Sequence, residues 1–165
     1  MLGFLGASAQ SVTYNCNFQD TNYGYSCVVL GASIINENAD VSFAGTHTNN
    51  RNNSDVVLTR FQSSTVNFVP NSIFSTFPNV EILDLEFCRV AAITQETFVG
   101  ADNLRAIYFF FNDIQELPAN VFSHAPNLYH VDLFLNRITD IHPEAFNGLE
   151  NLAILDLTLN YLEKY

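Results

Sequence analysis

The last two thirds of the chain repeat with a period of 24 residues. Residues 56–165 divide into four complete blocks and a fifth, partial one. Positions 1, 4, 6, 11 and 14 of the blocks are mainly apolar, position 9 is Ser, Cys or Asn, and position 19 is Phe in every complete block. One block of this length cannot bury its own apolar side chains, so the copies must stack side by side. The period therefore predicts a solenoid.

Each block contains the pattern LxxLxLxx(N/C)xL, which is clearest from Leu128 to Ile138. The alternating apolar residues at positions 4 and 6 predict a short strand with one buried face. Stacked strands then form a parallel sheet that lines the inner side of an arc. Position 9 follows the strand, where a buried Asn can bond the backbone groups that a turn leaves unpaired. We therefore expect Asn112, Asn136 and Asn160 to form a ladder.

Cys88 occupies the same position as these asparagines, so we predict a free, buried thiol at this point of the core. An intermolecular disulfide or a reactive thiol is the alternative. The position-19 phenylalanines are predicted to stack on the outer side of the sheet. These residues are Phe74, Phe98, Phe122 and Phe146.

The repeat pattern resembles the 24-residue class of extracellular leucine-rich repeats, as in Toll-like receptor ectodomains and secreted insect leucine-rich-repeat proteins. The resemblance covers residues 56–165. It implies an α/β solenoid: an arc with a parallel concave sheet, and mostly loops and short helical turns on the convex side. It also implies a recognition role, with immunity, receptor signalling or adhesion as settings, because the fold alone does not fix a function.

The resemblance also implies a cysteine-containing cap over the first repeat, which we assign to residues 10–55. Cys16 and Cys27 lie close together in a turn-rich segment, and we expect them to form a disulfide that pins a small hairpin. Residues 1–9 end in a small-residue cleavage pattern and suggest a signal-peptide remnant of a secreted chain, with a disordered start as the alternative. Asn52 begins a glycosylation sequon in the polar stretch 46–55.

The last repeat is incomplete at Tyr165 and is not followed by a closing cap. We expect a fragment of a longer protein, or a partner that covers Leu152 to Tyr165, because terminal repeats need capping.

The charge balance narrows the class of partner. The chain has 6 Lys and Arg against 17 Asp and Glu, a net charge of −11. This disfavours nucleic acid and anionic membrane surfaces, which attract basic proteins. No apolar run is long enough for a membrane span. The chain also lacks a nucleophile elbow, a glycine-rich phosphate loop and paired CxxC ligands, so we expect neither an enzyme nor a bound cofactor.

Function must then lie on the concave face, where positions 3, 5 and 7 point away from the core and position 8 follows at the rim. An apolar and aromatic band runs there beside an acidic stripe, and both are predicted to contact a protein partner with a basic patch. The residues are Asp84, Glu86, Phe87, Tyr108, Phe110, Phe111, His130, Asp132, Phe134 and Asp156.

Four alternatives remain open. The partner could be a glycan or a peptide, and the position-8 side chains could tuck under neighbouring loops. The chain could instead be a structural or self-association unit of a larger matrix or receptor protein. His130, Asp132 and Asp156 share the face and could hold a divalent metal ion, but a solvent-separated acidic column is the preferred interpretation, and we predict no metal site.

Overall fold

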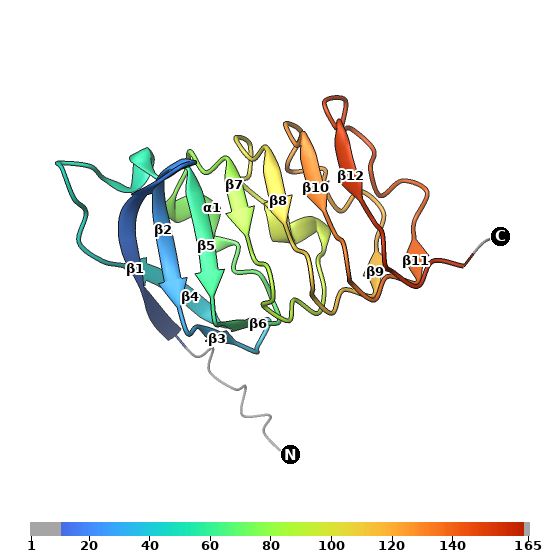
Figure 1. The fold of residues 1–165 in the computed structure, drawn as a ribbon, viewed down its shortest axis with the longest axis horizontal. Coiled ribbons are helices and arrows are strands. Elements are labelled where there is room, and N and C mark those ends of the chain that lie inside the picture. The colour runs from blue at the N-terminus through green and yellow to red at the C-terminus, as the bar shows by residue number, and fades with distance from the viewer. Residues whose placement is uncertain (1–10, 164–165) are drawn as a thin grey trace, which may run out of the picture.

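The computed structural model describes residues 11–163 as one long sheet backed by loops and short helical turns (Figure 1). One strand from each repeat enters this sheet, and neighbouring repeat strands are parallel and in register over 24 residues, as Asp84 opposite Tyr108 illustrates. The predicted parallel sheet and solenoid are thereby confirmed. The repeat strands are β5 (Leu58–Gln62), β7 (Ile82–Asp84), β8 (Ala106–Tyr108), β10 (His130–Asp132) and β12 (Ile154–Asp156).

Three further strands extend the sheet beyond the first repeat. β1 (Ser11–Thr21) and β2 (Gly24–Leu30) form an antiparallel hairpin, and β2 pairs in parallel with β5. The first half of β1 pairs in parallel with β4 (Asp40–Ala44), which forms the edge of the sheet. A disulfide joins Cys16 to Cys27 across the hairpin, as predicted. The proposed signal-peptide remnant, residues 1–9, lies outside the described residues, as do the last two residues.

The convex side carries only short elements. Two pairs of two-residue strands run parallel there, β3 (Ser33–Ile34) with β6 (Thr65–Val66) and β9 (Glu116–Leu117) with β11 (Asp140–Ile141). The helical turns are α1 (Ser72–Thr76), η1 (Asn53–Asp55) and η2 (Gln95–Phe98). This is the mixture of loops and short turns that the repeat pattern predicts.

The core lies between the sheet and this convex layer. Leu83, Ile107 and Val131, at position 4, have no exposed surface. On the outer side, the ring of Phe122 lies between its neighbours in the stack, with centroid distances of 5.5 Å to Phe98 and 5.7 Å to Phe146. In the last repeat Leu155 occupies position 4 but is 41% exposed, because no further strand covers the outer edge of β12 among the described residues.

The predicted asparagine ladder is present. The side-chain oxygen of Asn112 accepts from the backbone N–H groups of Cys88 and Val90, at 3.1 and 2.8 Å. Its amide nitrogen donates to the carbonyls of Leu85 and Phe109, at 2.9 and 2.8 Å. Each asparagine thus satisfies backbone groups of two adjacent repeats, which a turn into the core would otherwise leave unpaired.

Cys88 is free and fully buried, as predicted. Its thiol donates to the carbonyls of Glu86, at 3.2 Å, and Phe61, at 3.5 Å. Burial, together with the negative charges of Asp84 and Glu86, raises the pKa of the Cys88 thiol to about 12. A thiol of this kind is chemically inert, because the thiolate is the reactive form.

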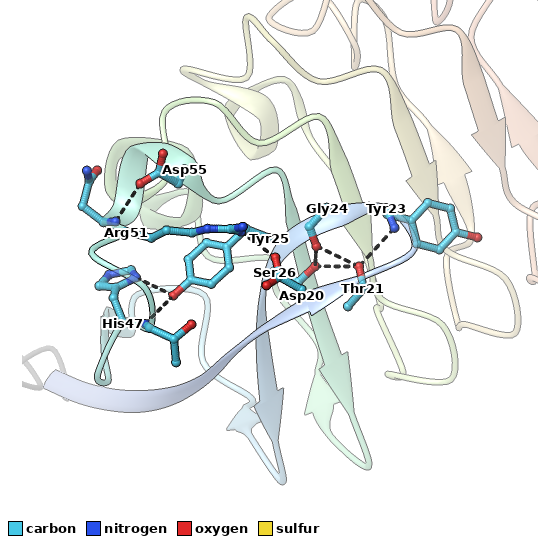
Figure 2. A network of polar contacts seen from close by, with 11 residues as sticks. Asp20, Thr21, Tyr23, Gly24, Tyr25, Ser26, His47, Arg51 and Asp55 are labelled. Carbon is cyan, nitrogen blue, oxygen red and sulfur yellow. Dashed lines mark hydrogen bonds and ion pairs between the residues drawn. The ribbon is translucent and has the colours of Figure 1, made fainter.

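The loop before the first repeat is tied to the hairpin by one tyrosine (Figure 2). The Tyr25 hydroxyl lies 3.1 Å from Nδ1 of His47 and accepts from the N–H of Thr48 at 3.1 Å. The Arg51 guanidinium lies 4.5 Å from the centre of the Tyr25 ring and bonds Asp20 at 2.6 Å. An aromatic ring and a cation attract each other in this arrangement, so the loop is held by both hydroxyl and ring.

Candidate functional site

The concave face presents the predicted contact residues in four neighbouring strands and the turns that follow them. Nine of the ten predicted side chains are exposed or partly exposed, and the exception is Asp84. They come from β7, β8, β10 and β12 or from the turn after each strand. The sheet register therefore brings together residues that lie 24 positions apart in the sequence.

Four phenylalanines from three repeats form one contiguous group, which we call the phenylalanine cluster: Phe87, Phe110, Phe111 and Phe134. Phe110 lies at its centre, with ring centroids 4.5 Å from Phe87 and 5.9 Å from Phe134. Phe87 and Phe111 are 5.0 Å apart. Tilted and edge-to-face pairs at these separations attract each other beyond simple area burial, so the cluster is a preorganised apolar surface.

Position 8 of each repeat has a left-handed backbone. The φ angles are +57° at Phe87 and Phe111 and +53° at Leu135, a region that bulky L-residues rarely adopt. The predicted alternative of a side chain tucked under a loop does not apply to the two phenylalanines, which are 56% and 53% exposed. This conformation could not be predicted from the residue types, because Gly or Asn is the usual occupant of a left-handed backbone.

A groove of about 520 Å³ lies beside these position-8 residues. Its apolar lining comes from Phe87, Phe111, Leu135 and Leu159, and polar groups of Arg89, Arg137 and Tyr161 line the other parts. Arg137 is ion-paired with Asp113 at 2.8 Å. These polar residues were missed at the sequence level, because they fall just after the strand positions on which the pattern is defined.

Asp84 does not face solvent, contrary to expectation. It is only 4% exposed, and Nε of Arg60 on the neighbouring strand lies 2.5 Å from its carboxylate. Arg60 and Asp84 share position 5 in consecutive repeats, so the pair could have been found from the columns themselves. The negative charge of Asp84 is thus neutralised within the chain.

The position-5 aspartates also bond their own backbone. Each accepts from the N–H two residues later, at the end of its strand. The bonds are Asp84 with Glu86 at 3.2 Å, Asp132 with Phe134 at 3.0 Å and Asp156 with Thr158 at 2.9 Å. The Thr158 hydroxyl and N–H bonds hold the pKa of Asp156 below its usual value. These aspartates of the predicted acidic column therefore also cap the ends of their strands.

In the third repeat, Tyr108 occupies position 5, where the second, fourth and fifth repeats have an aspartate. Its ring meets that of His130 edge to face, with centroids 5.0 Å apart. Burial, and then the nearby Tyr23, Asp84, Asp132 and Glu86, raise the pKa of the Tyr108 hydroxyl. Tyr23 comes from the turn of the β1–β2 hairpin, where Figure 2 shows it on the opposite side from Tyr25. Tyr23 was not predicted, because its neighbourhood with Tyr108 depends on how the hairpin joins the sheet.

Glu86 lies near the same aspartates, Asp84 and Asp132. Burial and then the charge of Asp84 raise the pKa of its carboxyl, Arg60 lowers it, and Asp132 raises it.

A cavity of about 780 Å³ opens near the starts of the repeat strands and is lined by residues that include Arg105, Tyr129 and His130.

Residues 11–163 contain no group of three His, Cys, Asp or Glu side chains placed to hold a metal ion, so His130, Asp132 and Asp156 do not converge on one. Within the same residues, no helix has the length and apolar character needed to cross a membrane.

A family model described as leucine rich repeat matches residues 78–136 and 126–165. Among solved structures, the APL1 leucine-rich repeat domain is 27% identical, with a TM-score of 0.73 over 93% of this chain and 38% of that chain. The LRIM1/APL1C complex is 24% identical, with a TM-score of 0.63 over 93% of this chain and 32% of that chain.

The Toll–Spatzle complex of Drosophila is 21% identical, with a TM-score of 0.58 over 72% of this chain and 17% of that chain. The chain thus spans less than two fifths of each of these structures. No curated protein matches the chain.

Proposed function

Because the chain belongs to the leucine-rich repeat family, we propose that it is an extracellular recognition module that binds a partner protein through its concave face. The phenylalanine cluster is the contact centre, and Tyr108 and His130 extend it along the same face. The mechanism is recognition by a rigid sheet rather than chemistry at a reactive group.

The observation that carries this proposal is the exposure of four contiguous phenylalanines. Phe87 and Phe111 are more than half exposed although each sits on a left-handed backbone, where a bulky residue is unfavourable. Soluble proteins seldom expose a large contiguous apolar surface without a binding role. Aromatic residues are also the side chains that most often dominate the free energy of protein association.

The charges beside the cluster favour a basic partner. Glu86, Asp132 and Asp156 are partly exposed on the same face, whereas Asp84 is already paired with Arg60. Carboxylates at the rim of an apolar contact steer association with basic groups and exclude acidic partners. The net charge of −11 acts in the same direction at longer range.

An extracellular setting is supported by the Cys16–Cys27 disulfide, since such bonds persist in oxidising compartments. We further propose that Asn52 carries an N-linked glycan: it is exposed and begins the sequon. Structural neighbours include LRIM1 in complex with APL1C and Toll in complex with Spatzle. Both complexes support binding of a protein partner, and they make immunity or receptor signalling the proposed setting.

The test compares wild type with the double variant Phe110→Ser/Phe134→Ser. Each protein is immobilised and exposed to extracellular fluid, and captured proteins are quantified by mass spectrometry. We expect at least one partner to be captured about tenfold more by wild type, a difference of roughly 1.4 kcal/mol. We expect the variant to fold, because both rings are partly exposed and neither belongs to the buried core. Circular dichroism checks this before binding is compared.

The matched control is Ile35→Ser/Val99→Ser, which removes two exposed apolar side chains outside the concave strands. It should capture the same partners as wild type. A folded Phe110→Ser/Phe134→Ser variant that captures an unchanged set of proteins overturns the proposal. Light scattering at two concentrations measures self-association. If the molar mass of wild type grows with concentration and that of the double variant does not, the partner is a second copy of this chain rather than another protein.

A further inference from the structure

The third repeat lacks a hydrogen bond that the repeats on either side of it contain. In the second, fourth and fifth repeats, an aspartate at position 5 accepts from the backbone N–H at position 7. This N–H lies just beyond the strand. Positions 6 and 8 donate to the next repeat instead. The N–H groups of Phe109 and Phe111 donate to the backbone carbonyls of Asp132 and Phe134. The aspartate is therefore the intrachain acceptor for position 7.

Tyr108 stands at position 5 of the third repeat and offers no acceptor that can fold back in this way. Among residues 11–163, the N–H of Phe110 donates no hydrogen bond. The same N–H belongs to the residue whose ring is the centre of the phenylalanine cluster, in contact with the rings of Phe87 and Phe134. A backbone N–H without a partner in the chain is available to a ligand, because each main-chain donor needs an acceptor once water is displaced from it.

The direction of this N–H follows from the neighbouring repeats. Asp84 and Asp132 reach the equivalent N–H groups from the concave side, since position 5 points away from the core. The Phe110 N–H therefore points to the concave side as well, toward the space that the absent carboxylate would fill. A ligand atom arriving on that face can take the place of the carboxylate oxygen.

The charges around this donor select the acceptor. Glu86, in the turn after β7, and Asp132, on β10, belong to the repeats on either side, and both raise the pKa of Tyr108. A ligand carboxylate placed between them would be repelled, because like charges are costly at short range. A neutral amide carbonyl meets no such repulsion. Apolar side chains beside that carbonyl would contact the phenylalanine rings, and Lys or Arg side chains would reach the flanking carboxylates.

We propose that the N–H of Phe110 donates a hydrogen bond to a main-chain carbonyl of an extended, apolar and basic segment of the partner protein. This inference rests on the proposed function and names the chemistry of the partner at the same face. The third repeat then differs from its neighbours for a reason: it exchanges an internal strand-ending bond for one made with the ligand.

The test uses two substitutions of nearly equal size, Tyr108→Asn and Tyr108→Leu. Both remove the phenol, but only the asparagine oxygen can accept from the Phe110 N–H, as the aspartates do in neighbouring repeats. The probe is a library of acetylated and amidated hexapeptides made of Leu, Phe, Lys and Ala. Affinities of peptides selected on wild type are then measured for both variants, together with hydrogen exchange of the Phe110 amide.

We expect slower exchange of the Phe110 amide in Tyr108→Asn, and an affinity at least tenfold weaker than that of Tyr108→Leu. Equal affinities of the two variants, with the amide protected in Tyr108→Asn, overturn the inference. So does a library in which no peptide binds wild type.

The Phe110→Ser/Phe134→Ser variant separates the two proposals. Weak binding of the selected peptides by this variant, with equal binding by Tyr108→Asn and Tyr108→Leu, removes the carbonyl contact and leaves the concave face as the binding surface. Selected peptides that bind the double variant as well as wild type count against both.

Discussion

The N-terminal segment, residues 11–55, and the repeats, residues 56–163, are stabilised in opposite ways. The repeats use the same few bonds again and again: Asn112 and Asn136 make equivalent contacts one repeat apart. The N-terminal segment uses contacts that occur once, namely the Cys16–Cys27 disulfide and the Tyr25 network. Repetition makes the first region predictable from its period, whereas the second depends on particular side chains.

The difference has a structural reason. An internal repeat has a neighbour on each side, so one asparagine bonds the backbone of two repeats, as Asn112 does with Leu85 and Phe109. The N-terminal segment has a repeat on one side only, and its chain reverses direction in the hairpin. Gly24 follows that turn with a φ of +117°, and a Cβ atom there would lie 2.6 Å from the Val57 side chain. Close packing against the first repeat thus requires glycine.

The largest effect should come from breaking the ladder at its best-connected member. Asn112→Ala leaves buried N–H groups of Cys88 and Val90 and the carbonyls of Leu85 and Phe109 without this partner. Each buried group left unpaired costs about 1–3 kcal/mol. We expect the free energy of unfolding to fall by about 4 kcal/mol, measured by urea denaturation.

Ser64→Ala is the matched comparison, because Ser64 holds the same position where the repeats meet the N-terminal segment. It makes only two bonds, with the N–H of Ala32 and the carbonyl of Gln62. We expect a loss of about 1–2 kcal/mol. Equal losses at the two positions would mean that the ladder does not concentrate stability in the interior repeats.

The next effect is on the N-terminal segment. Removing the disulfide with Cys16→Ser/Cys27→Ser, a pair 11 residues apart, should lower the free energy of unfolding by about 3 kcal/mol through the chain-entropy term. Hydrogen exchange should rise first in β1 and β4, while β10 keeps its protection, since the contacts of β10 lie in the repeats. A uniform rise across the sheet would contradict the division into two regions.

The periodic part of the fold was predictable because its causes recur. The strands, the burial of Cys88 and the stack around Phe122 all follow from residue type at a fixed position. The hairpin and its disulfide followed from the short spacing of two cysteines. The 11-residue length of β1 and its bend between two partner strands did not, because they arise from contacts that occur once.

The candidate site was predictable as a surface but not in its electrostatics. The columns correctly placed Phe110 and Phe134 together. They put Arg60 and Asp84 side by side at position 5, which makes an ion pair foreseeable, but they did not reveal that the pairing leaves Asp84 only 4% exposed. The missing bond at Phe110 was visible only after the aspartates of other repeats were seen to accept from their own backbone.

A smaller effect is expected from Tyr25→Phe, which keeps the ring beneath Arg51 and removes only the hydroxyl. The bonds to His47 and to the N–H of Thr48 are then lost. We expect a loss of about 1–2 kcal/mol, with faster hydrogen exchange confined to residues 46–55. Tyr14→Phe is the comparison on β1, the other strand of the hairpin, where the tyrosine hydroxyl bonds only the backbone of Ser33. Exchange that stays unchanged in the loop would show that the ring alone anchors it.

The smallest effect at neutral pH, and the one that depends most on conditions, concerns Cys88. Its folded pKa is about 12 against an ordinary value of 9.0. Above pH 9 the unfolded chain releases the thiol proton while the folded chain retains it, so the folded state is progressively destabilised as pH rises from 9 toward 12. Below pH 9 both states are protonated and the linkage vanishes.

Cys88→Ser removes this titration and keeps a small hydroxyl donor in the same site. Other titrating groups, such as the tyrosines, are common to both proteins, so the difference between them isolates the thiol. The free energy of unfolding of wild type should therefore fall more steeply than that of Cys88→Ser between pH 9 and 11, and the two slopes should be parallel between pH 6 and 8. Parallel slopes throughout would mean that Cys88 ionises as readily in the folded chain as in the unfolded chain, contrary to the burial of its thiol.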